Sequence, residues 1–145
     1  MEDYEDLDTG PDQNGQLNLA FHNWDEVPSD LYSHAATVKG LNLSHNRILD
    51  VPKEFGNLVM IRELDLSHNK LYQIDPVIML RRLRVLNLSH NCLSSIPENI
   101  ACCAMLVRIT LIYLISAFIL KNISPRTFVQ FVDYHCGHSG SFSLQ

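Results

Sequence analysis

The sequence predicts an α/β repeat solenoid, with a short parallel β-sheet on its concave face and short helical or irregular segments on its convex face. Nearly the same six residues occur three times, as LNLSHN at 41–46, LDLSHN at 64–69 and LNLSHN at 86–91. A fixed period in this range is typical of stacked solenoids. The chain has 145 residues, 46% of them apolar, and a formal net charge of −5, which fits one domain with its own core.

The first segment, residues 1–16, is acidic and rich in Gly, Pro, Asn and Gln, so we expect it to be disordered. Its start, MEDYEDLDTG, has neither the positively charged region nor the apolar region of a secretory signal. We therefore expect a cytoplasmic protein. The four cysteines show no paired spacing that would indicate disulfides, and reduced thiols are the expectation.

The second segment, residues 17–106, contains the repeats. Each full unit has three apolar positions, an asparagine and two further apolar positions. The three sets are Val38, Leu41, Leu43, Asn46, Ile48 and Val51; Ile61, Leu64, Leu66, Asn69, Leu71 and Ile74; and Leu83, Leu86, Leu88, Asn91, Leu93 and Ile96. A weaker unit precedes them, with Leu17, Leu19, Trp24 and Val27, and with His22 at the asparagine position.

The spacing inside each unit predicts its local structure. Two leucines two residues apart point to the same face of a strand, and the residues between them point to the other face. Proline follows the last aliphatic position in three units, as Pro28, Pro52 and Pro97, which suits helical or extended segments on the convex side. A single unit is too small to bury its own leucines, so stability must come from stacking.

This pattern, LxxLxLxxNxLxxIP, resembles the leucine-rich repeat family over residues 17–106. The unit of about 23 residues with its Ile-Pro pair most resembles the intracellular repeats of Ras-suppressor and scribble-like scaffold proteins. The resemblance implies a curved solenoid that binds other proteins.

The repeated asparagines, Asn46, Asn69 and Asn91, are predicted to be structural. An amide side chain both donates and accepts, so it can satisfy backbone groups of a turn that no regular sheet reaches. Stacked in register, the three side chains would form a buried hydrogen-bonded column.

The candidate partner-binding surface is the predicted concave face. Its polar residues offer many donors and acceptors of mixed charge, which suits recognition of a protein rather than of a buried small molecule. The residues are Asn42, Ser44, His45, Glu63, Asp65, Ser67, His68, Asn87, Ser89 and His90. The acidic balance of the chain gives no indication of nucleic-acid binding.

Three histidines in register, His45, His68 and His90, raise the alternatives of a metal site or of coupled titration. We expect exposed polar residues instead, with no metal and no cofactor, and with protonation disfavoured by neighbouring charge. The Ser and His residues lie on one flat ladder without a pocket or a nucleophile elbow, so we expect no enzymatic activity.

The third segment, residues 107–120, is apolar and is expected to be a degenerate fifth repeat or a cap. Leu106, Ile109 and Leu111 continue the register, but Leu114 replaces the asparagine. A membrane segment is an alternative, although the uncharged run from Ile109 to Leu120 is shorter than the roughly 20 residues of a spanning helix. Residues 121–145 show no repeat and are expected to be a tail that is unrelated to the solenoid.

The resulting hypothesis is a non-catalytic intracellular module that binds a partner protein on the concave face. Two alternatives stay open: a regulatory subunit in a phosphatase or small-GTPase pathway, and a membrane-anchored protein that uses residues 101–120. The loss of register after Leu106 also suggests a shortened or alternatively spliced form of a longer solenoid.

Overall fold

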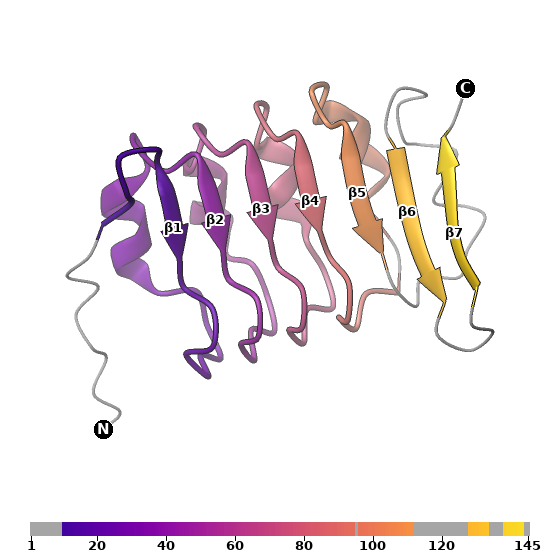
Figure 1. Ribbon diagram of the computed structural model, residues 1–145. Helices are drawn as coiled ribbons and strands as arrows, with labels where there is room; N and C mark the ends of the chain where they lie inside the picture. Colours follow the sequence, from indigo (N-terminus) through magenta and orange to yellow (C-terminus); the bar gives the residue numbers. More distant parts are fainter. Residues whose placement is uncertain (1–9, 95, 112–127, 134–137, 144–145) are drawn as a thin grey trace.

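The computed structural model describes residues 10–94, 96–111, 128–133 and 138–143. Within them, a seven-stranded sheet runs in strict sequence order from β1 to β7 (Figure 1). The strands are β1 Gln16–Asn18, β2 Gly40–Asn42, β3 Glu63–Asp65, β4 Val85–Asn87, β5 Arg108–Leu111, β6 Phe128–Asp133 and β7 His138–Ser143. Neighbouring strands from β1 to β6 are parallel, and β7 is antiparallel to β6. This arrangement confirms the predicted solenoid.

In the described part of the chain, the other face of the solenoid carries four short 3₁₀ helices (Figure 1). They are η1 Ser29–His34, η2 Lys53–Asn57, η3 Asp75–Met79 and η4 Glu98–Cys102. Prolines 28, 52 and 97 precede η1, η2 and η4 directly, with φ of −65°, −69° and −52°. Each proline is the N-cap residue and has an extended ψ, so its missing N–H removes no hydrogen bond from the helix that follows.

The core lies between the sheet and the 3₁₀ helices. The apolar positions of the sequence pattern are buried in every unit except at Trp24, which is half-buried, and residues from the convex side complete the packing. Leu31 of η1, Phe55 of η2 and Val77 of η3 have no exposed surface. Each unit therefore buries its leucines against its neighbours, as the physics of stacking requires.

Hydrogen bonds between units continue beyond the strands on both sides. At the amino ends of the strands, Arg62 N–H donates to Lys39 O at 2.7 Å and Arg84 N–H donates to Arg62 O at 2.8 Å. At the carboxyl ends, Leu43 N–H donates to Asp65 O at 2.8 Å. These bonds fix the register of successive units, so side chains at equivalent positions form straight rows across the sheet.

The amino-terminal segment differs from its prediction of disorder over residues 10–16. Asp12 organises a tight turn there: its Oδ1 accepts from Asn14 N–H and Gln16 N–H, each at 2.8 Å. Gly15 adopts φ of +77°, a conformation that glycine reaches without steric cost, and its carbonyl accepts from Lys39 N–H at 2.7 Å. The turn thereby joins the first strand to the second unit. Residues 1–9 lie outside the described part of the chain.

The carboxyl-terminal segment also differs from its prediction. β5 continues the parallel register from β4, as Leu106, Ile109 and Leu111 predict. Residues 128–133 and 138–143, predicted to be unrelated to the solenoid, instead add β6 and β7 to the same sheet. The physical reason is that the open edge of β5 presents backbone donors and acceptors, which a further strand satisfies.

The apolar run that raised the membrane alternative falls largely outside the described residues, as does Leu114. In the described part of the chain, none of the helices has the length and hydropathy needed to cross a membrane.

Candidate protein-binding surface

Two rows of side chains point outward from the parallel strands and form the concave surface. The first row is Gln16, Gly40, Glu63, Val85 and Arg108, and the second is Asn18, Asn42, Asp65, Asn87 and Thr110. The residues between the two rows are buried. Gly40 has no side chain, and the amide of Gln16 lies over it. Together with Asp12, the rows without Gly40 line a groove of about 690 Å³.

The Asn and Asp side chains of the second row are held in place by their own backbone. Asn42 Oδ1 accepts from the N–H of the residue two positions later at 2.9 Å, and Asp65 Oδ1 does the same at 2.9 Å. Asn18 Oδ1 accepts in the same way at 3.2 Å and Asn87 Oδ1 at 3.1 Å. Asn and Asp side chains often form this local bond, and it fixes the direction in which each side chain points.

The fixed side chains leave a defined set of polar groups facing the groove. The amide nitrogens of Asn18, Asn42 and Asn87 donate to no atom of the described residues, and Asp65 Oδ2 accepts from none. The second row therefore presents three donors and one acceptor, spaced by strands about 4.8 Å apart.

The charges in the groove are distributed unevenly. Glu63 and Asp65 lie together on β3, and Asp12 lies at the amino-terminal end. Arg108 on β5 is the positive charge at the other end. Two strand spacings, roughly 10 Å, separate the central acidic pair from Arg108. A partner segment that crosses the strands would meet acidic, neutral and basic positions in turn.

The three serines of the predicted surface require a correction. Ser44, Ser67 and Ser89 are 5%, 4% and 5% exposed, so they do not belong to the concave face. The predicted alternation of buried and outward-facing side chains holds only for the three residues of each strand. Immediately after the strand, the chain turns and stacks on the next unit, where Ser67 O accepts from His45 N–H at 3.1 Å.

The three histidines lie in these turns and do not line the groove, which is a second correction. His45, His68 and His90 have φ of 55°, 52° and 53°, a left-handed conformation in which histidine is found more often than most residues. Their rings stack in a column with Phe21, with centroid separations of 4.3, 4.2 and 4.1 Å.

The column disfavours protonation at its centre. Partial burial lowers the pKa of His68, and the positive charges that His90 and His45 carry when protonated lower it further, while Asp65 opposes them. Parallel rings in contact do not direct their nitrogen lone pairs at a common point. Among the described residues, no cluster of three His, Cys, Asp or Glu side chains has the geometry of a metal site.

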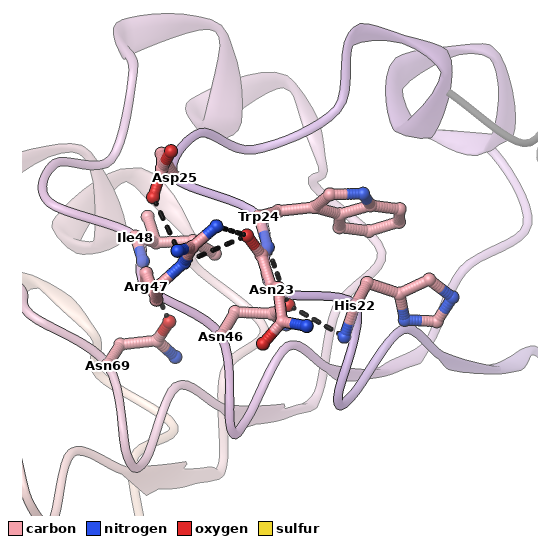
Figure 2. A network of polar contacts seen from close by, with 8 residues as sticks. All are labelled: His22, Asn23, Trp24, Asp25, Asn46, Arg47, Ile48 and Asn69. Carbon is pink, nitrogen blue, oxygen red and sulfur yellow. Dashed lines mark hydrogen bonds and ion pairs between the residues drawn. The ribbon is translucent and has the colours of Figure 1, made fainter. Parts of the chain in front are cut away.

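The asparagine column is part of the interior. Asn46 and Asn69 are each 7% exposed, while Asn91 is half-buried. Asn46 Oδ1 accepts from His22 N–H at 3.0 Å and from Trp24 N–H at 3.2 Å, as Figure 2 shows. Its Nδ2 donates to carbonyls of its own unit and of the preceding one. Each asparagine thus joins two consecutive units.

The same arrangement recurs at the next two units. Asn69 Oδ1 accepts from Ile48 N–H and Asn91 Oδ1 from Leu71 N–H, both at 3.0 Å. The column lies behind the turns that carry the histidines, and its hydrogen bonds hold these turns in position.

Several groove residues were not among the sequence-predicted site residues. Asp12, Gln16 and Asn18 come from the weak first unit, and Arg108 and Thr110 come from the fifth. Except for Asp12, their register with Asn42, Asp65 and Asn87 was available in the spacing of the leucines at 17, 41, 64 and 86 and of Ile109. The spacing of the apolar residues could therefore have identified these strand positions, and the polar residues themselves could not.

Comparison with known proteins matches two family models to this solenoid. The models are "Leucine rich repeat" over residues 16–71 and "Leucine Rich repeats (2 copies)" over residues 59–101.

Curated relatives match the same region. An adenylate cyclase of Schizosaccharomyces pombe is 36% identical over 77 residues, 52% of this chain and 5% of the relative. Osteomodulin of Rattus norvegicus is 33% identical over 87 residues, 58% of this chain and 20% of the relative. Leucine-rich repeat-containing protein 3 of Danio rerio is 36% identical over 87 residues, 57% of this chain and 32% of the relative. The chain thus spans at most about a third of these three relatives.

A solved structure shares the fold. A leucine-rich repeat protein of Leptospira interrogans superposes with a TM-score of 0.53 at 22% identity, over 84% of this chain and 37% of that chain. The repeat pattern, the ladder of units and both family models agree, and the chain belongs to the leucine-rich repeat family.

Proposed function

We propose that the chain is a non-catalytic module that binds a partner protein along the concave groove. Leucine-rich repeat proteins generally mediate protein–protein interactions, and their repeats are typically non-enzymatic. The observation that carries the proposal for this chain is the second row of the groove, in which each Asn or Asp is held by its own backbone while its remaining polar atom faces outward.

Pre-organised side chains make an efficient binding surface. A side chain that is already fixed loses little conformational entropy when a partner arrives, and ordering costs of this kind otherwise reduce affinity. The alternation of amide donors with one carboxylate acceptor suits the N–H and C=O groups of a peptide backbone and its polar side chains.

The centre of the groove is expected to contribute most to affinity, because central contacts exclude water and dominate binding energies. Glu63 and Asp65 lie on β3, with strands of similar composition on both sides. The test variant combines Glu63→Ala with Asp65→Asn. The second change keeps the Oδ1 acceptor that Asn42 and Asn87 use in the same way, so the turn after β3 is preserved while the charge is removed.

The experiment is affinity capture from cells with the tagged full chain, identification of the bound proteins by mass spectrometry, and measurement of affinity with the purified partner. The concave variant should lose at least tenfold in affinity and keep its melting curve. The matched control, Lys53→Ala with Asn57→Ala and Asp75→Ala, changes exposed residues of η2 and η3 on the opposite face. Loss of binding in the control variant with retention in the concave variant would place the partner on the wrong face for the proposal.

The narrower alternatives remain predictions with their own measurements. A regulatory subunit would change the activity of a captured phosphatase or GTPase regulator. A membrane-anchored protein would stay in the membrane fraction after high salt and alkaline washing. The cytoplasmic location is tested by imaging of the tagged chain.

A further inference from the structure

A second concavity lies away from the groove, between the segments that lead into η1 and η2. It has a volume of about 590 Å³, and its lining is mainly apolar. The apolar contribution comes from Val27 and Leu49, from the ring of Tyr32 and from Pro52. Leu49 is 52% exposed, whereas the other leucines of the described residues are buried. An apolar surface of this kind is suited to the carbon chain of a ligand.

Four carboxylates surround this apolar lining, from Asp25, Glu26, Asp50 and Glu54. No lysine or arginine belongs to the lining. Asp50 Oδ1 accepts from Val51 N–H at 2.8 Å, while no bond to a described residue engages its second oxygen. Glu26 and Glu54 form no ion pair within the described chain. The concavity is therefore strongly negative at its entrance.

One of the four carboxylates already pairs with a guanidinium group. Arg47 Nε lies 3.3 Å from Asp25 Oδ1, and Arg47 Nη2 donates to Asn23 O at 2.7 Å, as Figure 2 shows. A guanidinium group therefore already lies beside one carboxylate of the acidic rim. The carboxylates of Glu26, Asp50 and Glu54 remain for a cation of another molecule.

Tyr32 lines the pocket while its hydroxyl lies beneath the pocket surface. Its oxygen is buried, yet it has no hydrogen-bond partner among the described residues. Burial, with the nearby charge of Glu54, raises the pKa of Tyr32 to about 12, so the phenol stays protonated and neutral. Tyr32 therefore adds no negative charge to the pocket.

We propose that this pocket, formed by residues 25–32 and 49–54, binds an arginine side chain of a partner protein. The methylene chain of the arginine would lie on Leu49 and Pro52, and its guanidinium would reach the carboxylates of Glu26, Asp50 and Glu54. Arginine is favoured over lysine because a planar, weakly hydrated guanidinium stacks on an aromatic ring and forms forked bonds with carboxylates. This site is separate from the concave groove, and its test does not depend on the groove being used.

The test is an NMR titration of the ¹⁵N-labelled full chain with N-acetyl-arginine-N-methylamide. The probe should shift the amide signals of residues 25–32 and 49–54 in a saturable manner. The citrulline analogue, a neutral molecule of nearly the same shape, should produce shifts at least fivefold smaller at equal concentration. Equal shifts with citrulline would overturn the proposal, as would tighter binding of the corresponding lysine analogue.

Variants locate the site. Glu54→Gln combined with Asp50→Asn removes two charges while keeping the shapes of the side chains, and it should weaken binding of the arginine probe at least fivefold. Asp75→Asn is the matched control, because Asp75 is exposed on η3 and lies outside the pocket lining. An unchanged affinity in the double variant, with an unchanged melting curve, would refute the assignment.

Discussion

The asparagine column allows a stability prediction whose size follows from the hydrogen bonds of one residue. Asn69 makes four bonds: its Oδ1 accepts from Ile48 N–H, and its Nδ2 donates to the carbonyls of Leu43, Leu66 and Ser67. The change Asn69→Leu removes all four while leaving a side chain of comparable size in the interior.

The substitution does not leave all four hydrogen-bond partners of Asn69 unpaired. The carbonyl of Leu43 also accepts from Asn46 Nδ2 at 3.0 Å, and that of Leu66 also accepts from Asn91 Nδ2 at 2.8 Å. The carbonyl of Ser67 keeps its bond from a backbone N–H of the preceding unit. Only the N–H of Ile48 is left without an acceptor, in a fully buried residue. One unpaired buried donor costs about 1 to 3 kcal/mol, a substantial share of the 5 to 15 kcal/mol that stabilises a typical domain.

The assay is urea unfolding, followed by the fluorescence of the single tryptophan, Trp24, and by circular dichroism. With a slope of about 2 kcal/mol per molar urea, a loss of about 2 kcal/mol lowers the midpoint by roughly 1 M. Hydrogen exchange should show lost protection at the Ile48 amide. The control is Asn57→Leu, the same substitution at an exposed residue, which should change stability by less than about 0.5 kcal/mol. An unchanged midpoint for Asn69→Leu would refute the assignment of Asn69 as the acceptor of a buried amide.

Three further predictions concern the core, the ring column and the thiols. Phe55→Ala empties the largest fully buried side-chain site and should cost about 3 to 5 kcal/mol, measured by the same urea unfolding. Because burial and the neighbouring imidazoles lower the pKa of His68 below its unfolded value of 6.5, the unfolded chain binds the proton more readily, and stability should be full above about pH 6.5 and fall as the pH drops below it. His68→Asn should reduce this fall, and an identical pH profile in the variant would contradict the argument. Burial, with a smaller contribution from Cys102, raises the pKa of the Cys103 thiol to about 11, so a thiol reagent at pH 8 should label exposed Cys92 and Cys102 in the native chain and Cys103 only after denaturation, as peptide mapping by mass spectrometry would show.

The order in which strands pair was available in the sequence for the repeat region. The leucines two residues apart and the fixed period require each unit to add one strand beside the last, because no unit can bury its apolar residues alone. The same spacing placed β1 and β5 in register at Leu17 and Ile109, although both lie in imperfect units.

Tertiary structure decided which polar residues line the concave groove. The identical letters SHN occur in every full unit, yet the serine is buried, the histidine stacks in a turn and the asparagine bonds backbone groups of two units. A strand of three residues ends before the serine, and the alternation of faces ends with it. The position of the turn after Asn42 or Asp65 depends on the neighbouring unit. The spacing of residues along the sequence does not contain that information.

The sequence by itself determined the family, the apolar core and the straight rows of side chains, because all three follow from a repeated apolar period. Only the tertiary structure revealed the turn at Asp12, the joining of residues 128–133 and 138–143 to the sheet, and the acidic pocket beside Tyr32. Each of these depends on contacts between segments that lack a common pattern. The stability of these features comes from contacts between particular backbone edges and side chains. A periodic sequence pattern predicts only the contacts that recur in every unit.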